Sequence, residues 1–203
     1  GCTSNTTNAF INIDSCSVKA DFVENKKIVC IDNPVVNFSN VSITGVNSSY
    51  LWDFGPNAIP QTSTLATPPA VKFTTTGSQT IKLTVTDLTL KITNIKNSTV
   101  FVAPQPTIDA PNQSFCAGSN GVLLKASGAN IYSSFANTIV KPTIDTTYQL
   151  IGTDLNGCKD TVAVQIFVNP VPNLKLIATP NVVCKGSTTQ VSAVNQLSGI
   201  LTN

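Results

Sequence analysis

Residues 81–86 read Ile-Lys-Leu-Thr-Val-Thr, a strict alternation of apolar and polar side chains. Because successive side chains of a β-strand point to opposite faces, the pattern places Ile81, Leu83 and Val85 on one inward face and the polar residues on the other. Such a strand covers a core on one side and meets water on the other. The stretch therefore predicts a half-buried strand of an antiparallel sheet.

The same alternation recurs along the chain and marks two groups of strands. In the first group Val36 and Phe38 share one face, as do Trp52 and Phe54. The inward positions of the second group are Val122, Leu124, Ala126, Tyr148, Leu150, Val162, Val164, Ile166 and Val168. Glycine-containing turns punctuate these runs. The chain is therefore predicted to be all-β, with two successive antiparallel β-sandwich modules.

Alternating prolines follow each group of strands, at 103–106 (Ala-Pro-Gln-Pro) and at 169–172 (Asn-Pro-Val-Pro). Proline restricts its own backbone and that of the residue before it, so both segments favour an extended conformation with little hinge freedom. We therefore expect tandem β-sandwich domains that follow one another like beads on a string in a semi-rigid rod.

The cysteines occur in a repeated frame. Cys-x-Gly-Ser begins at Cys116 and again at Cys184, and Gly-Cys pairs occur at Cys2 and Cys158. Internal repetition of this kind is typical of arrays of small modules. We interpret the sequence as an excerpt from such an array. Its predicted parts are the end of a preceding repeat (1–15), two complete modules (16–103 and 104–171) and the beginning of a following repeat (172–203).

Six cysteines indicate an oxidising, extracellular compartment, because structural disulfides are rare in a reduced cytosol. Within the second complete module we pair Cys116 with Cys158. This bond closes a loop of about 42 residues, worth roughly 4 kcal/mol in the chain-entropy estimate. Cys30 is then expected to pair with Cys16, the available partner in the first module, across a loop worth roughly 3 kcal/mol.

On this interpretation Cys2 and Cys184 stay unpaired within the sequence and find their partners outside it. Spacing alone does not determine connectivity, so a Cys2–Cys16 bond, or thiols that stay free, remain alternatives. Zinc is not expected, because the chain has neither histidines nor the closely spaced cysteine pairs that structural zinc sites use.

Composition excludes several kinds of chemistry. Only 11% of the residues are charged, the net charge is +2, and the chain contains no His, Met or Arg. A His-dependent catalytic triad and a His-ligated metal are therefore excluded, and the isolated lysines form no basic patch for nucleic acid. No apolar run approaches the roughly 18 residues that cross a membrane. We expect no enzyme, cofactor, metal, nucleic-acid partner or membrane insertion.

Glu24 is the only glutamate, so a catalytic carboxylate pair would need one of nine scattered aspartates. It stands beside Lys26 and Lys27, a combination that also occurs where adhesins form intramolecular isopeptide bonds. Such bonds form between buried partners, whereas this cluster is predicted to be an exposed turn. We therefore do not expect a crosslink here.

Residues 50–55 (Tyr-Leu-Trp-Asp-Phe-Gly) and the strand-like run 71–87 resemble the PKD domain family. That family is marked by a W-D-F-G-D-G stretch and a later F-x-x-x-G-x-Y-x-V-x-L-x-V-x-D strand pair, and the resemblance spans roughly 16–103. It departs at Pro56-Asn57, where the family usually has Asp-Gly, and at Thr80, where Tyr is common. The first departure removes an acidic loop residue and makes a loop-bound cation less expected.

The second module resembles the Ig-like repeats of very large surface proteins from Bacteroidota. The resemblance rests on the Cys-Ala-Gly-Ser opening at Cys116, the stretch 146–158 and the Val-Asn-Pro ending at 168–170. In that group PKD and Ig-like modules are strung together and exported by the type IX secretion system. The resemblance implies an extracellular or cell-surface adhesin, stalk or filament. Its partners would be neighbouring repeats, further copies of the chain in an oligomer or filament, and surface glycans or other cells.

Two other functions remain open, namely carbohydrate-binding accessory modules of a secreted hydrolase and a self-assembling fibre or hook subunit. The first would use aromatic side chains as a sugar platform, and the candidates are Trp52, Tyr50, Tyr132 and Tyr148. Trp52, however, stands at strand spacing among apolar residues, which is more typical of a core position. The second would use exposed sheet edges or strand exchange.

Five further side chains have candidate roles. Asp53, Asp87 and Asp154 lie outside any dense acidic loop of the kind that calcium requires, so turn or capping roles are expected. Thr146 and Thr161 each follow an aspartate, and these pairs resemble the Asp-Thr acceptor sites of O-glycosylation in Bacteroidota.

Overall fold

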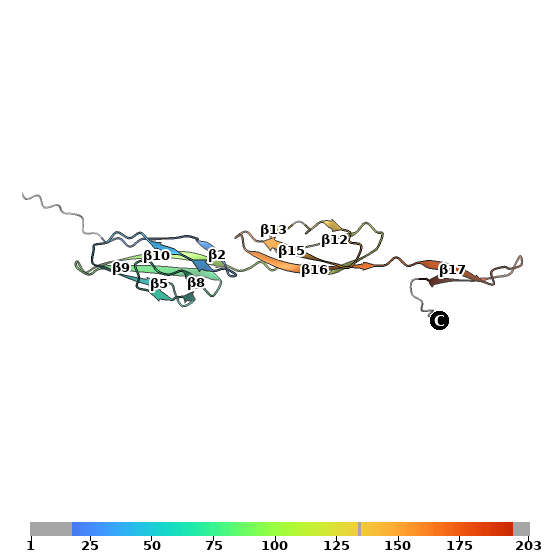
Figure 1. The fold of residues 1–203 in the computed structure, drawn as a ribbon, viewed down its shortest axis with the longest axis horizontal. Coiled ribbons are helices and arrows are strands. Elements are labelled where there is room, and N and C mark those ends of the chain that lie inside the picture. Colours follow the sequence, from blue (N-terminus) through green and yellow to red (C-terminus); the bar gives the residue numbers. More distant parts are fainter. Residues whose placement is uncertain (1–17, 134, 197–203) are drawn as a thin grey trace, which may run out of the picture. The chain divides into compact units, whose positions relative to one another are not determined.

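The computed structural model describes residues 18–133 and 135–196, and the described residues form strands, turns and loops without a helix (Figure 1). They divide into two compact units. One contains residues 18–106 together with the loop 153–159, and the other contains residues 107–152 and those that follow the loop. The predicted all-β fold with tandem sandwiches is confirmed. The predicted boundaries at 15/16, 103/104 and 171/172 stay predictions.

The first unit is a sandwich of one large sheet and two small ones. The large sheet has the order β2–β10–β9–β5–β7, with strands β2 (Ile28–Cys30), β5 (Ser48–Asp53), β7 (Thr62–Ser63), β9 (Gly77–Asp87) and β10 (Ile92–Ala103). The opposite layer has the β1–β4 pair and the β3–β8–β6 sheet, with strands β1 (Phe22–Glu24), β3 (Val35–Val36), β4 (Phe38–Asn40), β6 (Ala58–Ile59) and β8 (Val71–Phe73).

The core between these layers is rich in aromatic rings. Trp52 is fully buried, stacks on Phe54 with ring centroids 5.8 Å apart, and meets Phe22 edge-on at 5.2 Å. Ile81 and its two alternating neighbours on β9 are also fully buried, so the predicted inward face of residues 81–86 is confirmed. Other buried members of this core are Val29, Val36, Phe38, Ala58, Val71, Phe73, Val100 and Val102.

The second unit has a smaller core. Its sheet has the order β11–β16–β15–β13, with strands β11 (Gln113–Cys116), β13 (Ile131–Tyr132), β15 (Thr146–Thr153) and β16 (Lys159–Asn169). The other strands are β12 (Val122–Leu123) paired with β14 (Ile139–Val140), and the hairpin β17 (Leu174–Thr179) and β18 (Gln190–Asn195). The buried side chains are Phe115, Leu124, Val140, Leu150, Val164 and Ile166. These include the predicted inward positions Leu150 on β15, Val164 and Ile166 on β16, and Leu124 directly after β12.

Among the described strands, each unit has a parallel pair at the edge of its largest sheet, beside antiparallel pairs. β2 runs parallel to β10 with Cys30 opposite Ala103, and β11 runs parallel to β16 with Cys116 opposite Asn169. Parallel neighbours cannot be joined by a tight turn, so the two strands of each pair are far apart in the sequence and other strands of the unit lie between them in the chain. Each cysteine is thereby placed at the C-terminal end of the unit's last long strand.

Candidate functional site

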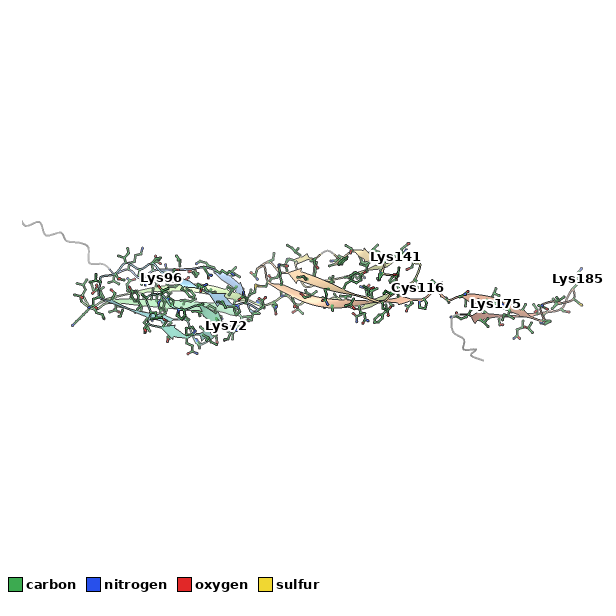
Figure 2. The ribbon with its side chains drawn as sticks, viewed as in Figure 1. Lys72, Lys96, Cys116, Lys141, Lys175 and Lys185 are labelled. Carbon is green, nitrogen blue, oxygen red and sulfur yellow. A yellow bond between two sulfur atoms is a disulfide. The ribbon has the colours of Figure 1, made fainter. Side chains whose placement is uncertain are left out.

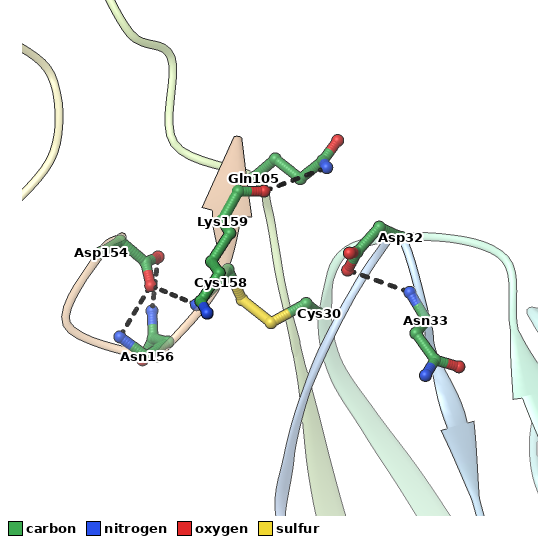
Figure 3. The surroundings of a disulfide bond; sticks show 8 residues. All are labelled: Cys30, Asp32, Asn33, Gln105, Asp154, Asn156, Cys158 and Lys159. Carbon is green, nitrogen blue, oxygen red and sulfur yellow. Dashed lines mark hydrogen bonds between the residues drawn. A yellow bond between two sulfur atoms is a disulfide. The ribbon is translucent and has the colours of Figure 1, made fainter. Parts of the chain in front are cut away.

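The most developed polar site of the described residues surrounds a disulfide between Cys30 and Cys158 (Figure 3). Cys30 ends strand β2, and Cys158 lies in the loop that joins β15 to β16 and belongs to the first unit. Their Cα atoms are 5.5 Å apart, within the range that disulfides span. The bond joins residues 128 positions apart in the sequence.

Asp154 shapes the loop that presents Cys158. One of its carboxylate oxygens accepts hydrogen bonds from the backbone N–H groups of Asn156 (2.9 Å) and Cys158 (2.8 Å). The backbone N–H of Asp154 also donates to the carbonyl of Cys158 at 2.9 Å, which closes the loop. Gly157 has φ +83°, a left-handed conformation that glycine adopts without steric cost. The loop therefore holds the cysteine through local bonds of its own.

Further contacts surround the bond. The side-chain amide of Gln105, between the two prolines of the first linker, donates to the carbonyl of Lys159 at 3.2 Å (Figure 3). A hollow of about 330 Å³ is lined by six residues around strand β2 and by Asn156 from the loop. Cys158 itself is buried, with 1% of its surface exposed. The loop is thus held by a covalent bond, a hydrogen bond and packing together.

The predicted Cys116–Cys158 and Cys16–Cys30 pairings are wrong, because Cys30 and Cys158 bond to each other. The physical reason is the parallel register of β11 on β16. Cys116 lies opposite Asn169, whereas Cys158 precedes the first residue of this 11-residue strand. At about 3.3 Å per residue the two cysteines are roughly 35 Å apart along the strand, far beyond disulfide reach.

The other predicted cysteine positions have different outcomes. Cys116 and Cys184 are free and exposed thiols, and Cys116 is labelled in Figure 2. The free state of Cys116 was not expected, because this residue was predicted to bond Cys158. That Cys184 lacks a partner within the sequence stays a prediction. Cys2 and Cys16 lie outside the described residues.

Aspartates occupy turns, as predicted. Asp53 accepts a hydrogen bond from the backbone N–H of Gly55 at 2.9 Å, which is a turn contact. Asp87 is buried and accepts from the N–H groups of Thr89 and Leu90 at 2.8 and 2.9 Å, so it closes the β9–β10 loop. In residues 18–133 and 135–196 no three His, Cys, Asp or Glu side chains gather as metal ligands would.

The aromatic candidates for a sugar platform do not gather on an open surface. Trp52 belongs to the core, as predicted, and its indole N–H donates to the carbonyl of Leu65 at 3.0 Å. Tyr50 packs half-buried against the same core. In the second unit the Tyr132 hydroxyl accepts a backbone N–H at 2.7 Å, and Tyr148 packs against Phe135. Each ring is thus engaged inside its own unit.

Glu24 differs from the sequence-based expectation of an exposed turn. Only 5% of its side chain is exposed, and its carboxylate meets the Lys27 amine at 2.9 Å and accepts a hydrogen bond from the Ser98 hydroxyl at 3.1 Å. Burial raises the pKa of Glu24, but the hydrogen bonds from Lys27, from its own backbone and from Ser98 together outweigh burial and lower it. The residue therefore forms a structural ion pair.

A second ion pair joins Asp21 to Lys96, whose atoms are 3.2 Å apart. The hydrogen bond from Lys96 lowers the pKa of the Asp21 carboxyl, an effect that desolvation only partly opposes. Both ion pairs of the described residues lie in the first unit. Their carboxylates are thus stabilised in the ionised form by folding of that unit.

The two candidate glycosylation threonines differ in accessibility. Thr161 is exposed, and its backbone N–H donates to Asp160 at 2.8 Å. Thr146 is half-buried, and its hydroxyl donates to the carbonyl of Ile144 at 2.8 Å. Modification at either position stays a prediction, with Thr161 the better placed of the two.

Sequence reasoning missed that Asp154 and Gly157 build the bonded loop. A signal was present, because the dipeptide Asp-Leu occurs at both hairpin turns, as Asp87-Leu88 at the end of β9 and as Asp154-Leu155 directly after β15. Recognising the pair as equivalent hairpin turns would have placed Cys158 at a turn, distant from Cys116.

Among the residues that the structure describes, none forms a helix long and apolar enough to cross a membrane. No family model matches the chain, and no curated protein matches it.

Several solved structures share part of the arrangement at low similarity. One is Drosophila N-cadherin EC1-4, with a TM-score of 0.34, 9% identity, and coverage of 71% of this chain and 47% of that one. Another is protocadherin gamma B2 domains 3-6, with a TM-score of 0.33, 9% identity, and coverage of 88% and 61%. A third is the Ig1-2 module of the Drosophila receptor phosphatase DLAR, with a TM-score of 0.30, 8% identity, and coverage of 74% and 99%. The chain spans less than two thirds of the two cadherin structures.

Proposed function

We propose that this chain is a non-catalytic structural and adhesive segment of a large secreted bacterial surface protein. In that protein PKD and Ig-like modules follow one another in a stalk, adhesin or extracellular filament exported by the type IX secretion system. Its mechanism is mechanical. The modules hold a binding region away from the cell, and repeated weak contacts add up to avidity.

The single observation that carries the proposal is the span of the Cys30–Cys158 bond. A pulling force applied on either side of the bond passes through the disulfide and bypasses the 128-residue loop that it closes. Most of both sandwich cores, from Val36 to Leu150, lies inside this loop. The bond therefore shields the enclosed parts of both cores from extension, a property suited to a segment that carries tension outside the cell.

Two further observations support an extracellular structural role. A disulfide persists in an oxidising compartment. Three of the carboxylates, Asp87, Asp154 and Glu24, are occupied in turns and in an ion pair. A carbohydrate-binding role receives no comparable support, because Trp52 is buried and the tyrosines engage partners within their own units.

Single-molecule force spectroscopy tests the mechanical role. The chain is pulled from its two ends, with and without reductant. We expect reduction to add roughly 420 to 460 Å of contour length, because 128 residues extend by 3.3–3.6 Å each. The Cys30→Ser/Cys158→Ser variant should behave like the reduced protein without reductant, and Cys184→Ser should behave like the oxidised protein. Equal contour lengths in the oxidised and reduced protein would contradict the proposal.

A further inference from the structure

Cys116 occupies the same place in the second unit that Cys30 occupies in the first. Each ends a strand that runs parallel to the unit's last long strand, opposite that strand's final residue, Ala103 or Asn169. In both units the residue after the cysteine donates its backbone N–H to the carbonyl of this final residue, at 3.0 and 2.8 Å. The two cysteines are therefore equivalent in strand, register and backbone hydrogen bonding.

The turn that follows each cysteine is also repeated. The backbone N–H three residues later donates to the carbonyl of the cysteine, from Asn33 at 3.0 Å in the first unit and from Ser119 at 3.1 Å in the second. Cys184 begins the same kind of turn, with Ser187 at 3.0 Å. It lies outside the described strands, so it has the turn without the parallel strand pair.

The surroundings of Cys116 differ from those of Cys30 in one respect. Next to Cys30, the loop residue Asn156 helps to line the hollow, so the bonded loop lies against it. Next to Cys116, a hollow of about 260 Å³ is lined by residues that flank this cysteine, by a segment directly after β14 and by a residue of β16, and by none from the loop 153–159. These residues are Phe115, Ala117, Gly118, Lys141, Pro142, Thr143 and Val168. Figure 2 shows Cys116 and Lys141 at the same end of the unit.

The linker after the strand pair is repeated as well. Ala103 is followed by Pro-Gln-Pro and Asn169 by Pro-Val-Pro. In the first linker Gln105 donates to Lys159, the residue after the bonded cysteine. In the second, a methyl group of Val171 lies within 4.0 Å of the position that a side chain on Gly118 would take, so this linker too lies against the turn after its cysteine.

We propose that Cys116 is the attachment position for a Gly-Cys hairpin loop of another module, of the kind that Cys158 provides to Cys30. The inference rests on the proposed function in one point, namely that another module of the array supplies the loop. Because Phe115, Pro142 and Val168 make the hollow mainly apolar, the preferred loop carries an apolar side chain where the bonded loop has Asn156. Its cysteine follows a glycine, as in Gly157-Cys158.

The bond forms by oxidation of two thiols, that of Cys116 and that of the incoming loop. A small-molecule or protein disulfide is the oxidant. Each thiol loses its proton, one S–S bond forms between them, and the oxidant's S–S bond takes up two electrons and two protons to become two thiols. The exposed position of Cys116 allows this exchange without unfolding of the unit.

The test uses the full chain with Cys2→Ser, Cys16→Ser and Cys184→Ser, which leaves Cys116 as the single thiol beside the Cys30–Cys158 bond. The probe is a backbone-cyclised peptide with the sequence of residues 151–161, its cysteine carried as a mixed disulfide with thionitrobenzoate. Attack by the Cys116 thiolate forms the protein–peptide S–S bond and releases thionitrobenzoate, so that electrons and atoms balance. The coloured product gives the rate.

We expect the loop peptide to react about tenfold faster than a cyclic peptide with the same residues in scrambled order, a ratio equivalent to about 1.4 kcal/mol. A peptide with Asn156→Leu should react faster still. The matched control protein carries Cys116→Ser and keeps Cys184. It should react equally fast with the loop peptide and the scrambled peptide. In denaturant all rates should be equal, which controls for the intrinsic reactivity of the peptides.

Equal rates of the loop and scrambled peptides at Cys116 in the folded protein would overturn the inference. A second result would also overturn it. The protein that keeps Cys116 as its single thiol is oxidised by a small disulfide in the presence of the loop peptide, and non-reducing peptide mapping then finds mainly a Cys116–Cys116 dimer. Either result leaves the force-extension experiment unaffected, because that depends on Cys30 and Cys158 only. Failure of this inference and failure of the proposed function are therefore distinguishable.

Discussion

The two sandwiches close their central hairpins with related turns, but only one of these turns carries a disulfide-bonded cysteine. The turn at the end of β9 starts from Asp87-Leu88 and contains no cysteine. The turn after β15 starts from Asp154-Leu155 and ends in a cysteine bonded to Cys30. In both, an aspartate side chain accepts backbone N–H groups from within the turn. Local hydrogen bonds thus set the turn, while one residue decides whether it becomes a covalent attachment.

The cores differ as well. The first unit packs Trp52 among four buried phenylalanines, whereas the second has Phe115 as its one buried aromatic ring among the described residues. Apolar burial is the main stabilising contribution to folding and grows with the area removed from water. The first unit is therefore expected to be the more stable of the two, and the following predictions test how separate the units are.

The largest expected effect comes from Trp52→Ala. Removing a fully buried indole should lower the unfolding free energy of the first unit by about 3–5 kcal/mol, because the cavity only partly collapses. Chemical denaturation followed by NMR signals from both units measures it. Tyr50→Phe is the control and should cost less than about 1 kcal/mol, since its hydroxyl has one long contact, 3.4 Å from Thr44. An equal loss of stability in the second unit would show that the units unfold together.

The next effect distinguishes the two turn aspartates. Asp87→Ala should destabilise the first unit by about 1.5–3 kcal/mol, because Asp87 is buried and accepts two backbone N–H groups that would lose their partner. Asp154→Ala should cost less, about 1 kcal/mol, since this turn is more exposed and water can replace the carboxylate. Thermal unfolding of both variants measures the difference. A larger loss for Asp154 would mean that the disulfide depends on its turn more than the geometry indicates.

A smaller effect concerns the left-handed residue in each turn. Lys91 has φ +56° and Gly157 has φ +83°. Lys91→Gly should stabilise the first turn by up to about 1 kcal/mol, and Gly157→Ala should destabilise the second by a similar amount, because a Cβ atom disfavours this conformation. Amide hydrogen exchange within each turn measures both. No change at Gly157 would indicate that the disulfide holds the turn regardless of its backbone preference.

The smallest effect is the response to acid. The pKa values of Asp21 and Glu24 are lowered in the folded first unit, so their contribution to stability is present above about pH 5 and is lost as pH falls through and below 4. The denaturation midpoint of the first unit should fall over this range. Glu24→Gln should flatten part of the pH dependence, and Lys91→Gln, outside both ion pairs, should leave it unchanged. A rise in stability on acidification would contradict this sign.

Alternation of side chains was enough to predict several of the strands, including β5, β9, β15 and β16, and most of their inward faces. Ile81, Leu83 and Val85 are buried as expected, and so are Leu150 and Val164 in the second unit. These predictions succeed because the two-residue period of a strand is a local property. The turn roles of the aspartates followed from equally local chemistry. The disulfide pairing failed because it depends on which strands become neighbours.

The sequence by itself determined the all-β fold, the two sandwich cores and the repeated cysteine frame, because each is written in short-range patterns of apolar residues, turns and motifs. Only the tertiary structure decided that β2 and β11 pair in parallel with the last long strands, and therefore that Cys158 meets Cys30 while Cys116 stays open. Strand order and register join residues far apart in the chain. A local sequence pattern does not specify strand order or register, because both are set by the packing of the whole unit.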